Sequence, residues 1–165
     1  MKRLSAIVGA TLMAFSLQLA AETRIGVVDL RQALFSSNDA QSFSEKLQQD
    51  FAGEEAKVRE AQEQARRLKD RIEKDGAMMN ESERNKLTGE FQEKVQEFNF
   101  LKQRLDQTVA QRKQQFLENA RPEVDAAVKE LLEEHNLDLI LPSEAVVYVK
   151  PEMNLTSELL EKLNR

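Results

Sequence analysis

The side chains that most often carry enzyme chemistry are scarce in this sequence. His135 is the only histidine, cysteine is absent, and there are only five glycines. A zinc site needs several His or Cys ligands, and a phosphate-binding loop needs clustered glycines, so the sequence indicates neither. His135 lies between Glu134 and Asn136 near the end of an expected helix, where a histidine is usually a solvated residue favoured by the helix dipole. We therefore expect no catalysis, no metal ion and no cofactor.

The composition indicates a long, exposed helical protein. Charged residues make up 32% of the chain, aromatic residues only 5%, and tryptophan is absent, which is too polar for a large compact core. The formal net charge of −5 argues against nucleic-acid binding. Residues 66–94 hold eight basic and seven acidic residues, whereas residues 118–138 hold two basic and seven acidic. Positive charge is thus concentrated in the middle of the chain.

The N-terminus has the pattern of a secretory signal peptide. Two basic residues at positions 2 and 3 precede an uncharged, mostly apolar stretch over residues 4–19, and Ala20 and Ala21 supply the small residues of a cleavage site. The apolar stretch is shorter than the roughly 20 residues of a membrane-spanning helix, which argues against a membrane anchor. We expect residues 1–21 to be removed, which takes the formal net charge from −5 to −7.

A short strand and a long helix are predicted next. Residues 24–30 (RIGVVDL) are rich in β-branched side chains, as strands are, and residues 36–39 (SSND) favour a helix N-terminus. A heptad pattern of apolar residues follows, which is typical of a coiled-coil seam; Glu54 is its one polar member. The apolar seam positions are Leu47, Phe51, Val58, Ala61, Ala65, Leu68 and Ile72. A helix over residues 39–74 would be about 54 Å long.

A tight tip over residues 75–80 turns the chain back on itself. Gly76 suits the left-handed position that often ends a helix, and Asn80 with Glu83 resembles a capping box that begins the next one. Because the tip is short, the second helix must return antiparallel to the first. Pro122 predicts a kink or a restart in the returning helix, which then continues to about residue 134.

The chain is predicted to end in two buried strands, residues 137–141 (LDLIL) and 145–150 (AVVYVK), and a small helix capped by Thr156 or Ser157. Strands near both ends make the helical hairpin an insertion in a small sheet. Small sheets are marginally stable, and their open edges invite pairing with another chain. We therefore expect an oligomer, in which a closed ring of strands would remove the edges.

The predicted fold class is α+β and mostly α: a long antiparallel coiled-coil hairpin that projects from a small β-sheet body, completed as a barrel by trimerisation. Residues 22–38 form the first strand and linker of the body. Residues 39–121 form the hairpin, and residues 122–165 form the end of the helix, two strands and the last helix.

These segments together resemble the Skp/OmpH family of periplasmic chaperones. The resemblance covers residues 22–165 and is most specific in the first strand and in residues 136–163, with LDLIL, AVVYV and LTSELL. It implies a homotrimer in the periplasm, with a small β-barrel body and three helical hairpins around a central cavity. Unfolded outer-membrane β-barrel proteins would be held in that cavity, without ATP, on their way to the outer-membrane assembly machinery.

Three residues are the predicted client contacts. Phe100 lies two residues from the seam residue Phe98, so it points to another face; the alternatives are a lone surface aromatic or one covered by the trimer. Met78 and Met79 lie at the tip, where adaptable Met side chains suit varied partners. The alternative for both is that they cap the hairpin seam.

The family also has a basic cluster on the returning helix that has been proposed to bind lipopolysaccharide. In this chain only Arg112 matches it, with Lys102 and Lys113 nearby, and Gln111 stands where a second Arg is expected. This departure argues against a specific lipopolysaccharide site and leaves a weak anionic contact as the prediction. A different function is an envelope adaptor whose hairpin docks on one folded partner protein. Known adaptors of that kind carry larger β-rich domains than the residues that follow His135 could supply.

Overall fold

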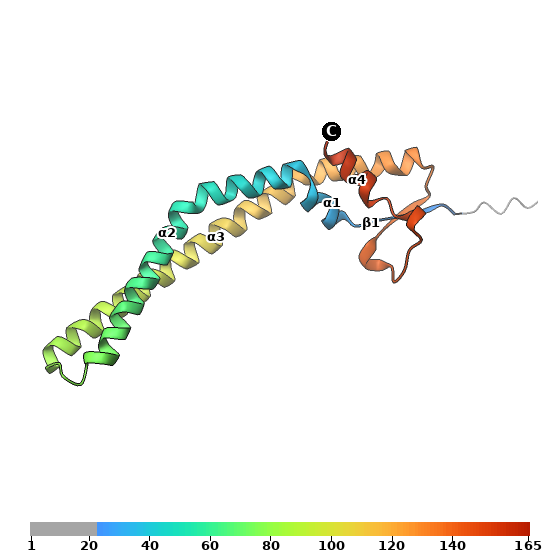
Figure 1. Cartoon of the computed structure of the whole chain (residues 1–165). Coiled ribbons are helices and arrows are strands. Elements are labelled where there is room, and N and C mark those ends of the chain that lie inside the picture. Colours follow the sequence, from blue (N-terminus) through green and yellow to red (C-terminus); the bar gives the residue numbers. More distant parts are fainter. Residues whose placement is uncertain (1–22) are drawn as a thin grey trace, which may run out of the picture.

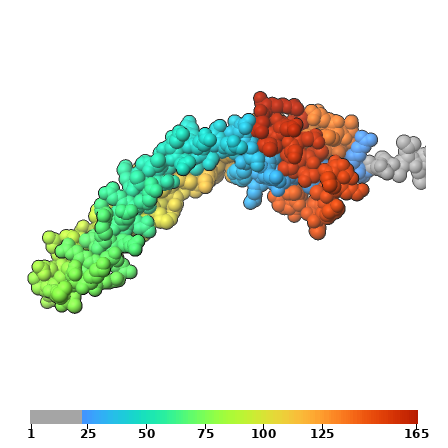
Figure 2. All heavy atoms as spheres, viewed as in Figure 1, coloured from blue at the N-terminus to red at the C-terminus, as the bar shows by residue number. Residues whose placement is uncertain are grey.

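The computed structural model describes residues 23–165, so the predicted signal peptide lies outside the described residues. Along the chain the elements are β1 (Ile25–Val28), α1 (Leu30–Ser36), α2 (Asn38–Asp75), α3 (Glu81–Glu134), β2 (Leu139–Pro142), two short 3-10 turns η1 (Ser143–Ala145) and η2 (Pro151–Met153), and α4 (Thr156–Leu163). We call the α2–α3 hairpin the arm. The other elements and the end of α3 form the body, from which the arm projects as a long curved rod (Figures 1 and 2).

The arm has the predicted antiparallel coiled-coil seam. Ala61, Ala65 and Leu87 are buried between the two helices, and Glu54, the polar member of the heptad pattern, stays exposed. Near the body, the rings of Phe43 and Phe116 stack with their centroids 4.5 Å apart. Large seam residues such as Phe51, Leu68 and Phe98 are partly buried, as expected where only two helices pack together.

The tip confirms one prediction and corrects another. Asn80 and Glu83 form a complete capping box: the Glu83 N–H donates to Asn80 Oδ1 at 2.9 Å, and the Asn80 N–H donates to Glu83 Oε2 at 3.2 Å. Gly76, however, has a right-handed helical backbone, so the predicted left-handed cap is wrong. Glycine is needed there because a Cβ would clash with the carbonyl oxygen of Ile72.

Pro122 lies inside α3, which runs unbroken from the tip to Glu134, so the predicted restart does not occur. Proline removes one backbone hydrogen bond from a helix. The residues that follow are held in place by the body, because Ala127 and Leu131 are buried in its core. Packing there offsets the loss of one bond.

The body contains a two-stranded parallel sheet in which Ile25 pairs with Leu139 and Val28 with Pro142. The predicted first strand is too long, because Asp29 ends it by accepting the Gln32 N–H and capping α1, a helix that the sequence reading missed.

The predicted strand over residues 145–150 does not form within one chain; Val147 and Tyr148 are exposed. The other edge of β1 is already engaged, since the Leu155 N–H donates to the carbonyl of Val27 at 2.9 Å. Residues 145–150 therefore find no free β1 edge inside the chain. Val147 and Tyr148 face outward, whereas Val146 and Val149 are partly buried.

The core of the body collects apolar side chains from β1, α1, α3 and α4, namely Val28, Ala33, Ala127, Leu131, Leu155, Leu159 and Leu163. The N-terminus of α4 differs from the prediction, since Thr156 is not its cap. The Thr156 hydroxyl accepts the Asp29 N–H at 2.9 Å and donates to Asn154 Oδ1 at 2.7 Å. One buried hydroxyl thus joins the end of β1 to the start of α4.

The change Thr156→Val keeps the shape of the side chain and removes both hydrogen bonds. Because it leaves the Asp29 N–H in the body without a partner, we expect the free energy of unfolding to fall by about 1–3 kcal/mol. Urea unfolding followed by circular dichroism measures this. Ser157→Ala, at the exposed neighbouring position, is the control and should change stability little; equal stability of all three proteins would refute the role of Thr156.

Candidate functional surfaces

The two tip methionines are placed differently. Met78 is highly exposed, whereas Met79 is partly buried and lines a hollow at the end of the seam with Arg71 and Leu87. The structure therefore separates the two interpretations of the sequence. Met78 is available for an external contact, and Met79 packs the end of the arm.

Phe100 is exposed on α3, with 62% of its surface accessible. Its neighbours Phe98 and Leu101 are partly buried on the seam side of the helix. The expectation that Phe100 points away from the seam is confirmed. Its distance along the arm from Met78 means that the two residues do not form one pocket.

The three predicted basic residues also do not form one cluster. Lys102 is paired with Asp106 on the next turn of α3. Arg112 and Lys113 make no ion pair with any residue of the range 23–165 that the structure describes. Along the arm, Lys94 lies 2.7 Å from Glu97, and this hydrogen bond raises the pKa of Lys94. Of the three predicted basic residues, Arg112 and Lys113 are therefore the ones whose charge is not paired within the described residues.

An apolar hollow at the root of the arm was missed by the sequence reading. It has a volume of about 380 Å³, and we call it the root groove. Its lining residues are Phe35, Ala40, Phe43, Ser44, Leu47, Lys113, Phe116 and Leu117. Phe35 could not be anticipated, because it lies on α1, a helix that was not predicted. The pair Phe116-Leu117 was the only sequence signal, since adjacent helical residues cannot both face the seam.

A second apolar surface lies on the body. A hollow of about 300 Å³ is lined by Val28, Leu30, Val124, Val128, Ile140 and Pro142, together with the charged residues Asp125 and Lys129. Leu139, Val147 and Tyr148 are also exposed on the body. We call the lining of this hollow the body apolar face. Adjoining apolar side chains of this kind on a small protein mark an interaction surface.

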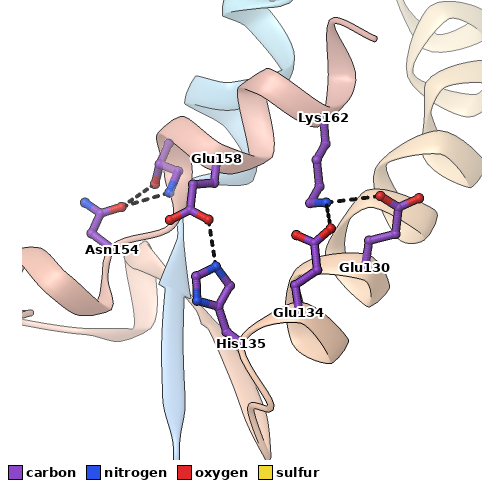
Figure 3. Close-up of polar contacts among 7 residues, drawn as sticks. Glu130, Glu134, His135, Asn154, Glu158 and Lys162 are labelled. Carbon is purple, nitrogen blue, oxygen red and sulfur yellow. Dashed lines mark hydrogen bonds and ion pairs between the residues drawn. The ribbon is translucent and has the colours of Figure 1, made fainter.

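A polar clasp fastens α4 to the end of α3 (Figure 3). Lys162 Nζ lies 2.7 Å from Glu134 Oε1 and 3.1 Å from Glu130 Oε2, and only 4% of its side chain is exposed. The hydrogen bond to Glu134 raises the pKa of Lys162, and the same bond lowers the pKa of Glu134. Beside it, His135 Nε2 lies 2.6 Å from Glu158 Oε2.

The clasp has a structural role. His135 does lie at the helix end, as predicted, but its ring contacts a carboxylate of α4 instead of standing alone in solvent.

Between residues 23 and 165, no His, Cys, Asp and Glu side chains are grouped in a way that could hold a metal ion. No helix in the same range is long and apolar enough to cross a membrane.

Known proteins resemble the chain over nearly its whole length. The family model for outer membrane protein (OmpH-like) matches residues 24–163. A Skp-like protein of Pseudomonas aeruginosa is 27% identical, with 88% of this chain and 86% of that protein covered. The chaperone protein Skp of Vibrio cholerae is 24% identical, with 87% and 85% covered.

The fold is also found in a crystal structure from Caulobacter crescentus, described as an OmpH-like outer membrane chaperone. It superposes with a TM-score of 0.62 at 14% identity, over 98% of this chain and 89% of that one. At this identity the likeness concerns the fold alone.

The clasp predicts how stability depends on pH. The lowered pKa of Glu134 stabilises the fold above the ordinary pKa of a glutamate, and this contribution is lost as the pH falls through the lowered value. The raised pKa of Lys162 stabilises the fold below the ordinary pKa of a lysine, and this contribution is lost as the pH rises through the raised value. The clasp is thus fully effective only between the two ranges.

We expect Lys162→Met to destabilise the protein most near neutral pH and least in strong acid. Urea midpoints of wild type and variant over a pH series measure the difference. The control is Lys46→Met, since Lys46 is an exposed lysine of α2 outside the clasp. A difference between wild type and Lys162→Met that does not change with pH would rule out the ionic role.

Proposed function

Because the chain belongs to the OmpH-like family of outer membrane proteins, we propose that it is a holding chaperone of the periplasm. It would bind unfolded outer-membrane β-barrel proteins without ATP, prevent their aggregation, and release them to the outer-membrane assembly machinery. The names of its relatives support this proposal, since the V. cholerae protein is a chaperone. The signal-peptide pattern at residues 1–21 supports export.

The observation that carries the proposal is the arm itself. It is a helical rod whose exposed apolar side chains are scattered along its length. Met78 lies at the tip, Phe100 in the middle, and the root groove near the body. Unfolded barrel strands expose many apolar side chains in no single arrangement. Several weak contacts spread over a long surface hold such a client with high avidity, and they need no pocket specific for one sequence.

We further propose that three chains assemble through the body. Two strands make a small sheet with an open edge, and the body apolar face is a surface of the kind that marks an interaction site. The exposed residues 145–150, which have the composition of a strand, would pair with a neighbouring chain. Three arms projecting from one body would enclose a cavity, whose walls would present Phe100 and Met78 to a client.

Charge would add a modest contribution. The net charge of −7 after loss of residues 1–21 gives little long-range attraction for acidic clients, so binding would rest mainly on apolar contact. Arg112 and Lys113, which have no ion-pair partner among the described residues, are the proposed weak contact for anionic groups such as those of lipopolysaccharide. Lys102 contributes less, because Asp106 already neutralises it.

The proposal predicts that the purified mature protein suppresses aggregation of a urea-denatured outer-membrane barrel after dilution, with or without ATP. Light scattering during dilution measures this, and a folded soluble protein of similar charge is the control. A protein that fails to suppress aggregation, and instead captures one folded envelope protein in stoichiometric amount, would support the adaptor and contradict the holdase.

The same assay tests the client contacts. We expect Phe100→Ala combined with Met78→Ala to raise the concentration needed for half-protection about threefold to tenfold, because each change removes exposed apolar area from the arm. Phe100→Leu, which keeps an apolar side chain, is the matched control and should protect nearly as well as wild type. Unchanged protection by the double variant would show that clients bind elsewhere.

A further inference from the structure

The root groove is formed where three elements meet. Phe35 comes from the end of α1, Phe43 and Leu47 from α2, and Phe116 and Leu117 from α3. Phe35 is 56% exposed and Leu117 is 44% exposed. Single exposed apolar residues are ordinary on protein surfaces. Apolar side chains from three separate elements around one hollow indicate a binding surface instead.

The groove is held open by the local structure. Its floor contains the stacked rings of Phe43 and Phe116. The turn between α1 and α2 is fixed by Ser37, whose hydroxyl donates to the Leu34 carbonyl at 2.7 Å and accepts the Ala40 N–H at 3.2 Å. This turn sets the position of Phe35 relative to α2. A preformed hollow binds a ligand without an ordering cost in the protein.

The groove also carries a charge without a partner. Lys113 is part of its lining, and Arg112 is its neighbour in sequence. Neither residue forms an ion pair within residues 23–165. An apolar hollow with an unneutralised cation selects a ligand that has both apolar side chains and an acidic group.

We propose that the root groove binds an extended segment of an unfolded polypeptide that carries an acidic residue beside large apolar side chains. The apolar side chains occupy the hollow, and the carboxylate pairs with Lys113. The volume of about 380 Å³ is at the lower end of ligand sites, about 300–1,000 Å³, which suits a few side chains. This inference rests on the proposed holding function and adds a composition-selective contact to the unselective ones at Phe100 and Met78.

The absence of tryptophan from the chain allows a direct test on the mature protein. Two short synthetic peptides contain Trp and Leu and are identical, except that one has an Asp where the other has an Asn. Each is titrated with the protein at low salt, and binding is followed by the fluorescence of the peptide Trp. We expect the Asp peptide to bind wild type about two- to fivefold more tightly, the effect of one exposed ion pair. Lys113→Glu should reverse this preference. Lys86→Glu, at another exposed lysine of α3 without an ion pair in the described part of the chain, should retain it.

The apolar part of the site is tested by Leu117→Ser, which should weaken both peptides about fivefold. Ala110→Ser, at an exposed residue of α3 that does not line the groove, is the control and should bind as wild type does. Unchanged binding in Leu117→Ser and Lys113→Glu would overturn the inference. A loss of oligomeric mass in Leu117→Ser would also overturn it, because a second copy would then occupy the groove. Displacement of the peptide by anionic lipid vesicles, with no Asp preference, would overturn it in favour of a lipid.

Failure of this inference is distinguishable from failure of the holding function. If only the inference is wrong, wild type and both groove variants suppress barrel aggregation equally, and each peptide binds all three proteins with the same affinity. If the holding function is wrong, wild type itself neither suppresses aggregation nor binds either peptide.

Discussion

The structure depends on closing a very long loop with a very small sheet. β1 and β2 are separated by the whole arm, yet they pair in parallel with Ile25 opposite Leu139. The entropic cost of closing such a loop grows only slowly with its length, but it must be offset by the few apolar side chains of the body. This explains why the body is cross-linked by polar bonds as well: Thr156 joins β1 to α4, and Lys162 joins α4 to α3. With both ends of the arm fixed at one place, the helices can extend far into solvent.

The same arrangement leaves the arm with little packing of its own. Its seam fully buries only Ala61, Ala65 and Leu87, the larger seam residues stay partly exposed, and Glu54 interrupts the heptad pattern. The stability of the two helices also depends on well-capped termini, such as the Asn80–Glu83 capping box, and on their antiparallel pairing. Phe100, two positions from the seam residue Phe98, and Met78 at the tip remain on the outside of the arm. In the proposed holding function, these exposed apolar side chains contact the client.

The sequence predicts the helical elements well because their signals are local. The heptad pattern gives the seam, and Asn80 with Glu83 gives the start of α3. The body is predicted less well because its contacts are distant in sequence. The role of Asp29 as the cap of α1 is evident only once β1 is seen to end there. Residues 145–150 resemble a strand but do not pair in one chain, where Leu155 already engages the second edge of β1. The root groove was missed for the same reason, since Phe35 approaches Leu117 only after α1 has folded against the arm. The role of Phe100 and Met78 in binding clients stays a prediction.

The central claim is that the body is completed by other copies of the chain and that the arms surround a shared cavity. Its most direct test is the molar mass of the mature protein from light scattering, measured over a range of concentrations together with small-angle X-ray scattering. We predict three times the mass of one chain, with a scattering profile of an elongated, hollow particle. A mass of one chain at every concentration, with the profile of a compact particle, would contradict both the trimer and the cavity.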